Sequence, residues 1–503
     1  MAISVLKIKN TWKIGVYQSL VKILPFRTFP IQHQQLLGQP TALTHPHLMQ
    51  PNEITPGITL NEYKERRKNL VKVMKNTHFG KSHDKHLLIF SSNPTYFMGP
   101  DVPYHFRQNS NFLYLTGYQE PDSVLIIEIG MNNVSGDDYR TIFFTRPRDK
   151  TREIWDGPRN GLEGATEHFG FQEAYPIDEI SQVILKRFSD KDCHIWYDHM
   201  QPSHLHINKD IMDVLLNSSE FHLKKLHAVG HIVESLRVVK SPAEISIMKK
   251  CANITAHGFM KTMSHTKPDV QESQLQNVME YECKKLGANR LSFPPVVAGG
   301  QMANTLHYVN NDQLLRNGDL LLVDSGCELN GYSSDVTRVW PVDGSYTKPQ
   351  KELYDILLNI QKNCIKLCKV GTSIDKLYQT MIGMMIHKFE AIKLIPKDLP
   401  QHHKHQLVRQ LCPHNIGHYL GMDVHDVCSM SKNLPLDEGM VITIEPGVYV
   451  RNDMDVPTRY KGIGIRIEDD ILITKEGPEV LTSLCPKETD EIESYIGMAR
   501  KKC

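Results

Sequence analysis

The chain has 503 residues, of which 40% are hydrophobic and 23% are charged, and this length is sufficient for two hydrophobic cores. Its 58 basic and 57 acidic side chains give a formal net charge of +1, so the composition provides no bulk attraction to nucleic acid or to anionic lipid, and we expect no nucleic-acid partner. The ten cysteines form no CxxC pair, and we interpret them as reduced thiols in a reducing compartment.

The N-terminal segment, residues 1–53, differs in charge from the rest of the chain. No Asp or Glu precedes Glu53, whereas five Lys and Arg residues are spread among apolar residues up to Arg27. The lysines interrupt every apolar run that a secretory signal would need. A basic amphipathic presequence fits this pattern, so we expect mitochondrial import, with a cytosolic form without the leader left open. A disordered or surface-helical tail is the alternative.

No membrane span is expected, because no run approaches the ~18 consecutive apolar residues that a spanning helix needs. After a Pro-, Thr- and His-rich stretch at 40–57, which looks like a linker, charged helical patterning begins at "LNEYKERRKNLVKVM". The segments "HLLIF" and "SVLIIEI" that follow are typical of strands. Strands and helices therefore share this region, which indicates an α/β or α+β domain.

A second helix start is predicted at Ser241 and Pro242, which can serve as cap and first-turn residue, with Glu244 close behind. Strands alternate with helices on both sides of this point. We therefore divide the chain into a leader and linker (1–53), an N-terminal domain (54–240) and a C-terminal domain (241–503).

Four carboxylates interrupt apolar strands in the C-terminal domain: Asp324, Asp335, Glu445 and Glu468. Alternation along the last of these strands places Arg466 on the same face as Glu468. Any one of these acids alone could be an ordinary salt-bridge or edge residue. Four ionised carboxylates among apolar residues, however, need a compensating cation or raised pKa values.

Three histidines accompany the carboxylates in "CPHNIGHYLGMDVHD", namely His414, His418 and His425. The first two could instead lie on one face of a surface helix, and the Glu of an HExxH zinc helix is missing. Two divalent ions would cancel the charge of two Asp and two Glu, and oxygen donors with one imidazole favour manganese over a thiolate-bound zinc. Two such ions about 3.5 to 4 Å apart can bind a hydroxide and stabilise an oxyanion, which predicts a hydrolase.

The motifs "VDSGCE", "SDVTR", "HNIGHYLGMDVHD", "TIEPGVY" and "GIRIEDD" resemble the aminopeptidase P and prolidase branch of the pita-bread metallopeptidases. Upstream, "HFRQNSNFLYLTGYQEPDSVLII" and "EIWDGPRNG" resemble the N-terminal domain of aminopeptidase P. The similarity covers residues 54 to 490. It implies an α/β (α+β) chain, with an aminopeptidase P N-terminal domain before a pita-bread catalytic domain, that removes the N-terminal residue from peptides with proline in second position. It also implies a dimer or a higher assembly.

The resemblance implies a role for each predicted metal ligand. Asp324, Asp335, His418, Glu445 and Glu468 would hold the two ions, most simply Mn²⁺. Asp335 and Glu468 would bridge them, His418 would bind one ion only, and Glu445 would also shuttle protons from the attacking water.

Other residues match positions around the substrate in this family. His307 and His425 would line the proline side and contact the scissile group, although each could also be an ordinary core histidine. His414 would line the pocket, Arg466 would support the metal ligands, and Asp101 would approach the substrate amine.

Phe293, in "LSFPPVVAGG", departs from the family pattern, because relatives commonly present Tyr there. Losing the hydroxyl removes one hydrogen bond, which is not expected to abolish activity.

Two other functions stay open at this point. A prolidase restricted to Xaa-Pro dipeptides would use the same ligands. A pita-bread module without metals could serve as a non-catalytic binding protein, but such a module is expected to have lost ligands, whereas all five are present here.

Overall fold

The computed structural model describes residues 36–77, 84–130, 139–188, 193–218 and 225–500. The predicted presequence lies almost wholly outside these ranges and stays a prediction. None of the helices found within them is long and apolar enough to cross a membrane.

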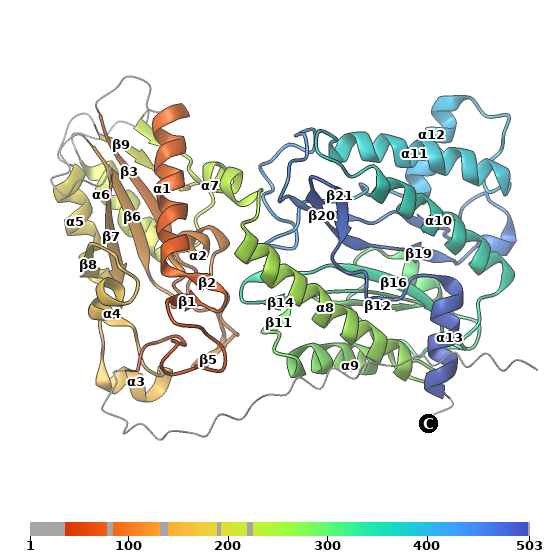
Figure 1. Cartoon of the computed structure of the whole chain (residues 1–503), viewed down its shortest axis with the longest axis horizontal. Helices are drawn as coiled ribbons and strands as arrows, with labels where there is room; N and C mark the ends of the chain where they lie inside the picture. The colour runs from red at the N-terminus through yellow and green to blue at the C-terminus, as the bar shows by residue number, and fades with distance from the viewer. Residues whose placement is uncertain (1–35, 78–83, 131–138, 189–192, 219–224, 501–503) are drawn as a thin grey trace, which may run out of the picture. The chain divides into compact units, whose positions relative to one another are not determined.

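A six-stranded mixed sheet, in the order β10–β9–β3–β6–β7–β8, organises the first half of the chain (Figure 1). Its strands are β3 (Lys85–Ser91), β6 (Val124–Ile129), β7 (Arg140–Thr145), β8 (Glu173–Pro176), β9 (Cys193–Trp196) and β10 (Leu226–His227). Strands β3 and β6 contain the two predicted apolar runs, which confirms both predictions.

Helices cover both faces of this sheet, because alternate residues of a strand point to opposite sides. Leu87 and Ile89 pack with α5 (Ile180–Phe188) and α6 (Leu205–Asn217), whereas Leu88 packs in the core that includes α1 and α2. The helix α1 (Leu60–Thr77) is the predicted charged helix, and α2 spans Ser110–Thr116. The smaller elements of this half are β1 (Glu53–Thr55), β2 (Ile58–Thr59), β4 (Phe97–Gly99), β5 (Val102–Pro103), α3 (Lys150–Asp156), α4 (Gly161–Glu167) and α7 (Gly230–Arg237).

The stretch predicted as a linker is anchored to the rest of the fold at four buried residues: Thr41, Met49, Ile54 and Thr55. Gln39, which immediately precedes it, is buried as well, and its side-chain amide donates to the carbonyls of Ile54 and Gly117 at 3.1 and 3.0 Å. Residues 37–503 accordingly form one compact unit by their contacts.

The second half opens with α8 (Pro242–His265), which begins where the sequence predicted. The Ser241 hydroxyl accepts a hydrogen bond from the Glu244 backbone, and the Glu244 carboxylate accepts one from the Ser241 backbone at 2.8 Å. This reciprocal pair satisfies two amides that the first helical turn leaves free.

Two three-stranded antiparallel sheets, ordered β12–β13–β16 and β17–β20–β21, lie between helices in this half (Figure 1). Their strands are β12 (Val296–Gly299), β13 (Leu320–Ser325), β16 (Val336–Pro341), β17 (Val441–Ile444), β20 (Asp469–Thr474) and β21 (Gly477–Val480). Shorter pairings join β11 (Arg290–Leu291), β14 (Cys327–Leu329) and β15 (Tyr332–Ser333), and separately β18 (Gly447–Tyr449) and β19 (Gly464–Arg466). The helices are α8, α9 (Glu272–Lys285), α10 (Lys348–Lys366), α11 (Ile374–Ala391), α12 (Gln401–Leu411) and α13 (Thr489–Arg500).

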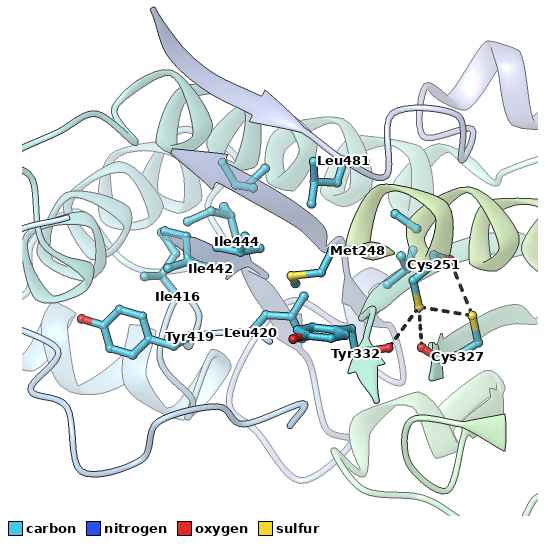
Figure 2. Close-up of a cluster of buried hydrophobic side chains, with 14 of the residues drawn as sticks. Met248, Cys251, Cys327, Tyr332, Ile416, Tyr419, Leu420, Ile442, Ile444 and Leu481 are labelled. Carbon is cyan, nitrogen blue, oxygen red and sulfur yellow. Dashed lines mark hydrogen bonds between the residues drawn. The ribbon is translucent and has the colours of Figure 1, made fainter. Parts of the chain in front are cut away.

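Figure 2 shows the apolar layer behind β17, where Ile442 and Ile444 lie in a buried cluster that also includes Ile416 and Leu420. Because these two isoleucines face the core, the intervening Thr443 and the following Glu445 project to the opposite side. The strand therefore aims Glu445 away from the apolar layer.

The same close-up shows a contact between two buried cysteines. The Cys251 thiol donates to the Cys327 carbonyl at 2.9 Å, and the two sulfur atoms are 3.5 Å apart. All nine cysteines in the described residues are free, as predicted for a protein with reduced thiols.

Candidate functional site

The predicted acids and His418 line one pocket of about 590 Å³. Asp324 lies in β13, Asp335 directly precedes β16, Glu445 directly follows β17, and Glu468 lies between β19 and β20. His418 lies on an irregular segment after α12, so the alternative of a surface helix carrying His414 and His418 is wrong.

A tight turn brings the two aspartates together. Asn330 and Gly331 both have positive φ, 53° and 84°, as a two-residue hairpin turn requires, and they join β14 to β15. Gly326 allows the strands to close up, since a Cβ there would lie 1.7 Å from the Ser334 carbonyl oxygen. Antiparallel pairing of β13 with β16 then sets Asp324 opposite Thr337, two residues after Asp335.

Ligand atoms of Asp335, His418 and Glu468 all lie within 4.8 Å of one another. The His418 Nε2 atom is 3.5 Å from Asp335 Oδ2 and 3.8 Å from Glu445 Oε1. His418 Nδ1 lies 3.0 Å from the Tyr419 carbonyl, so we assign the ring proton to Nδ1. The lone pair of Nε2 then faces carboxylate oxygens, an arrangement that a cation between them would stabilise.

The carboxylates of the pocket are poorly compensated by the protein itself. Asp324 Oδ1 and Asp335 Oδ1 are buried and have no hydrogen-bond partner. Burial and the neighbouring Asp324 raise the pKa of Asp335 well above its ordinary value. Burial and then the charge of Asp335 do the same to the pKa of Glu468, and burial raises the pKa of Glu445. Bound cations would remove this repulsion, and the donor set of carboxylates and one imidazole suits them.

Arg466 connects the ligands through three hydrogen bonds. Its Nη2 donates to Asp324 Oδ2 at 2.5 Å, its Nη1 donates to the Tyr449 hydroxyl at 2.7 Å, and its Nε donates to Thr337 Oγ1 at 3.0 Å. The Thr337 hydroxyl in turn donates to Glu468 Oε2 at 2.6 Å. These contacts hold Asp324 and Glu468 in fixed orientations relative to each other.

Sequence reasoning missed Thr337 and Tyr449. Strand alternation places Thr337 on the same face as Asp335, and this signal could have identified it. The Tyr449 hydroxyl accepts from Arg466 and lies 2.9 Å from His414 Nε2, while His414 Nδ1 lies 2.8 Å from the Asn415 carbonyl. His414 therefore joins the Arg466 network as well as lining the pocket.

The remaining predicted residues separate into two groups. Phe293, His307 and His425 line the pocket, and the His425 ring lies edge-on to the His418 ring at 4.4 Å between centroids. Asp101 does not line it: this residue is exposed, with φ of 63°, in the turn between β4 and β5. Apolar walls complete the pocket, among them Leu306, Val309, Val424, Val427 and Met430.

The segment that carries His425 is clamped by residues of the first half of the chain. Arg237 ion-pairs with Asp423 at 2.9 Å and with Asp426, to which Lys240 also donates at 3.2 Å. Arg107 donates to the Met422 carbonyl at 2.8 Å. These contacts fix the backbone on both sides of His425.

Comparison with known proteins gives consistent matches over both halves. Residues 246–475 match the model of metallopeptidase family M24, and residues 63–196 match that of the aminopeptidase P N-terminal domain. The chain is similar to Xaa-Pro aminopeptidase 3 of Homo sapiens, with 42% identity over 95% of this chain and 93% of the relative. It is also similar to the mitochondrial intermediate cleaving peptidase 55 of Arabidopsis thaliana, with 40% identity over 95% of this chain and 91% of the relative. Among solved structures, zinc-substituted aminopeptidase P of Escherichia coli in complex with product matches with a TM-score of 0.80 and 32% identity, over 88% of this chain and 99% of that one.

Proposed function

The chain belongs to the aminopeptidase P branch of metallopeptidase family M24, and from this premise we propose that it removes the N-terminal residue from peptides whose second residue is proline. The observation that carries the proposal is the pocket in which the predicted ligands meet an apolar wall and two histidines. A pocket of this composition can hold a charged reaction centre beside an apolar ring.

We assign metal binding to Asp324, Asp335, His418, Glu445 and Glu468, and we propose two divalent ions, Mn²⁺ in the first instance. The unpartnered oxygens of Asp324 and Asp335 support this assignment, as does the Nε2 lone pair of His418. When bound, such ions supply Lewis acidity toward water and toward the scissile carbonyl.

The protein's own groups would then orient the substrate and move protons. Glu445 accepts the proton of the attacking water and delivers it to the leaving prolyl nitrogen, a task that suits a carboxylate placed in the pocket. His307 and His425, which line the pocket, contact the proline side of the substrate and the scissile group. Arg466 keeps Asp324 oriented and is thus a positioning residue.

Selectivity for proline follows from the shape of the Xaa-Pro bond. This bond has no amide hydrogen and the φ angle of proline is restricted, so peptidases that require that donor fit it badly. Phe293, Val309 and Val424 offer apolar contacts to the ring and require no such donor.

We further propose that the protein acts in mitochondria, as the acid-poor leader and the mitochondrial relative suggest, and that it forms a homodimer. The hairpin that carries Asp101 supports an assembly, because five large apolar side chains on it or beside it are 52–62% exposed: Tyr96, Phe97, Met98, Val102 and Tyr104. In a dimer, Asp101 could act on the substrate bound by the other subunit. The domain division near residue 240 is part of the same proposal.

A peptide panel tests the proposed activity. The purified metal-loaded protein is incubated with Xaa-Pro-Xaa, Xaa-Pro and Xaa-Ala-Xaa peptides, and the products are identified by mass spectrometry. Release of only the first residue, and only before proline, is expected. Cleavage confined to dipeptides would establish the prolidase alternative, and cleavage of the alanine peptides at equal rate would overturn proline selectivity.

A further inference from the structure

The catalytic pocket contains a lysine that the proposed reaction does not use. Among the described residues that line it, only Arg466 and Lys432 carry a permanent positive charge. Arg466 is engaged with Asp324, Tyr449 and Thr337. The Lys432 side chain makes one hydrogen bond, from Nζ to the Gly417 carbonyl at 3.3 Å, and has no ion pair with any carboxylate in the described part of the chain.

Lys432 lies within electrostatic reach of the reaction centre. Gly417, its hydrogen-bond partner, immediately precedes His418 and also lines the pocket. The pKa of His425 is lowered first by burial and then by positive neighbours, one of which is Lys432. The ammonium group is therefore on the pocket wall, close to His425.

The charged groups of a peptide determine which part of it can bind the Lys432 ammonium. The α-amine of the substrate is positive, so Lys432 repels it. An ammonium has three hydrogen-bond donors, and Lys432 uses one of them on Gly417, so two remain for a ligand oxygen. A carboxylate is the strongest acceptor that a peptide can offer.

We propose that Lys432 binds a carboxylate on the leaving half of the substrate, and this inference rests on the proposed peptidase function. In an Xaa-Pro dipeptide the carboxylate is the C-terminus of proline itself. In a longer peptide it is the side chain of an acidic residue after proline. Lys432 thus determines how efficiently the enzyme cleaves dipeptides and acidic peptides relative to longer neutral peptides.

The test compares substrates that differ by one charge. The first pair is Xaa-Pro and Xaa-Pro amide, and the second pair is Xaa-Pro-Glu amide and Xaa-Pro-Gln amide. For each substrate, kcat/KM is measured with four proteins: the wild type, Lys432→Gln, Lys432→Arg and Lys475→Gln. Lys475 is a matched control because its side chain is 75% exposed and lies outside the pocket. Lys432→Gln removes a charge-assisted hydrogen bond, so it should reduce the preference for the charged member by about 10- to 150-fold.

The first pair tests a main-chain carboxylate and the second pair tests a side-chain carboxylate. The pair whose charge preference falls in Lys432→Gln therefore identifies which carboxylate Lys432 binds. Lys432→Arg should keep most of the preference, and Lys475→Gln all of it. An equal loss on charged and neutral members in folded Lys432→Gln, or no loss on either, would overturn the inference.

Calorimetric titration of proline and prolinamide into the metal-loaded protein repeats the comparison without turnover. Proline should bind more tightly than prolinamide to the wild type but not to Lys432→Gln, and equal affinities in the wild type would contradict the inference. A wild type that cleaves neither the Xaa-Pro substrates nor the longer peptides with proline in second position would instead refute the proposed function, so the two failures are distinguishable.

Discussion

Arg237 and Asp426 form a buried ion pair, with side chains 4% and 1% exposed, directly beside His425. Arg237 ends α7 in the first half of the chain, whereas Asp426 belongs to the pocket wall. The ion pair therefore connects Arg237, in the first half of the chain, to the segment that carries His425, a proposed substrate contact.

Replacing Arg237 with Ala should destabilise the protein strongly. The substitution leaves Lys240 as the one cation paired with the buried Asp426 carboxylate in the described residues, and removing one partner of a buried pair typically costs about 3–5 kcal/mol. Urea unfolding measures the loss. The control is Lys249→Ala. Lys249 forms an ion pair with Glu479, and because the two side chains are 43% and 45% exposed, its loss should lower the free energy of unfolding by at most about 1 kcal/mol. Equal effects of the two substitutions would show that the Arg237 clamp is unimportant.

Thr337→Val should weaken metal binding while leaving the fold intact. The substitution keeps the side-chain shape but removes the hydroxyl that donates to Glu468 and accepts from Arg466. Loss of such a supporting contact typically lowers metal affinity about 10- to 100-fold. Equilibrium dialysis followed by elemental analysis gives the affinity. The control is Thr380→Val, at an exposed hydroxyl on α11 that should not affect metal binding. An unchanged affinity in Thr337→Val would contradict the proposed role of Thr337.

Phe293→Tyr should retain or raise the activity. The ring lines the pocket, and a hydroxyl added there would supply a hydrogen-bonding group that Phe293 lacks. Such a bond is worth about 0.5–1.5 kcal/mol, which corresponds to a change of up to about tenfold in rate or affinity. Steady-state kinetics on an Xaa-Pro-Xaa peptide checks the prediction. A large loss of kcat/KM would mean that the pocket has no room for the hydroxyl.

Glu173 should make the stability of the protein depend on acid pH. Burial alone would raise its pKa, but hydrogen bonds from Tyr175 and Arg187 outweigh burial and lower the pKa below its ordinary value. A carboxyl whose folded pKa is depressed stabilises the protein above its unfolded pKa of about 4.3, and this contribution is lost as pH falls through the folded value.

Glu173→Gln should therefore flatten the decline in the free energy of unfolding between about pH 5 and pH 3. Urea unfolding at several pH values measures the slope. Glu65→Gln, at a position where the side chain is 50% exposed, serves as the control and should leave the slope unchanged. If the slope for Glu173→Gln equals that of the wild type, Glu173 does not contribute to the pH dependence of stability.

Local sequence signals predicted much of the architecture and the ligand set. The cap at Ser241 and the apolar runs of β3 and β6 each involve residues that are close together in the sequence, so they can be recognised from the sequence alone. The four acids were found because each interrupts an apolar strand, which is costly without a compensating partner.

The contacts that orient these ligands could not be predicted in the same way. Tyr449 and Lys432 carry no unusual local pattern, and their importance arises only when the fold brings Arg466 beside Tyr449 and Gly417 beside Lys432. Strand alternation indicates the face on which Thr337 lies, but it does not predict the hydrogen bonds of Thr337 with Arg466 and Glu468. The clamp between Arg237 and Asp426 joins residues 189 positions apart, and neither residue alone signals the other.

Metal content measured together with activity tests whether the pocket works as a metal centre. The protein is stripped with a chelator, its metal content is verified by elemental analysis, and Mn²⁺, Co²⁺ or Zn²⁺ is restored while cleavage of an Xaa-Pro-Xaa peptide is followed. Our account predicts no cleavage by the stripped protein, and activity that rises until about two ions are bound per chain. Full activity in protein shown to contain no metal would contradict it.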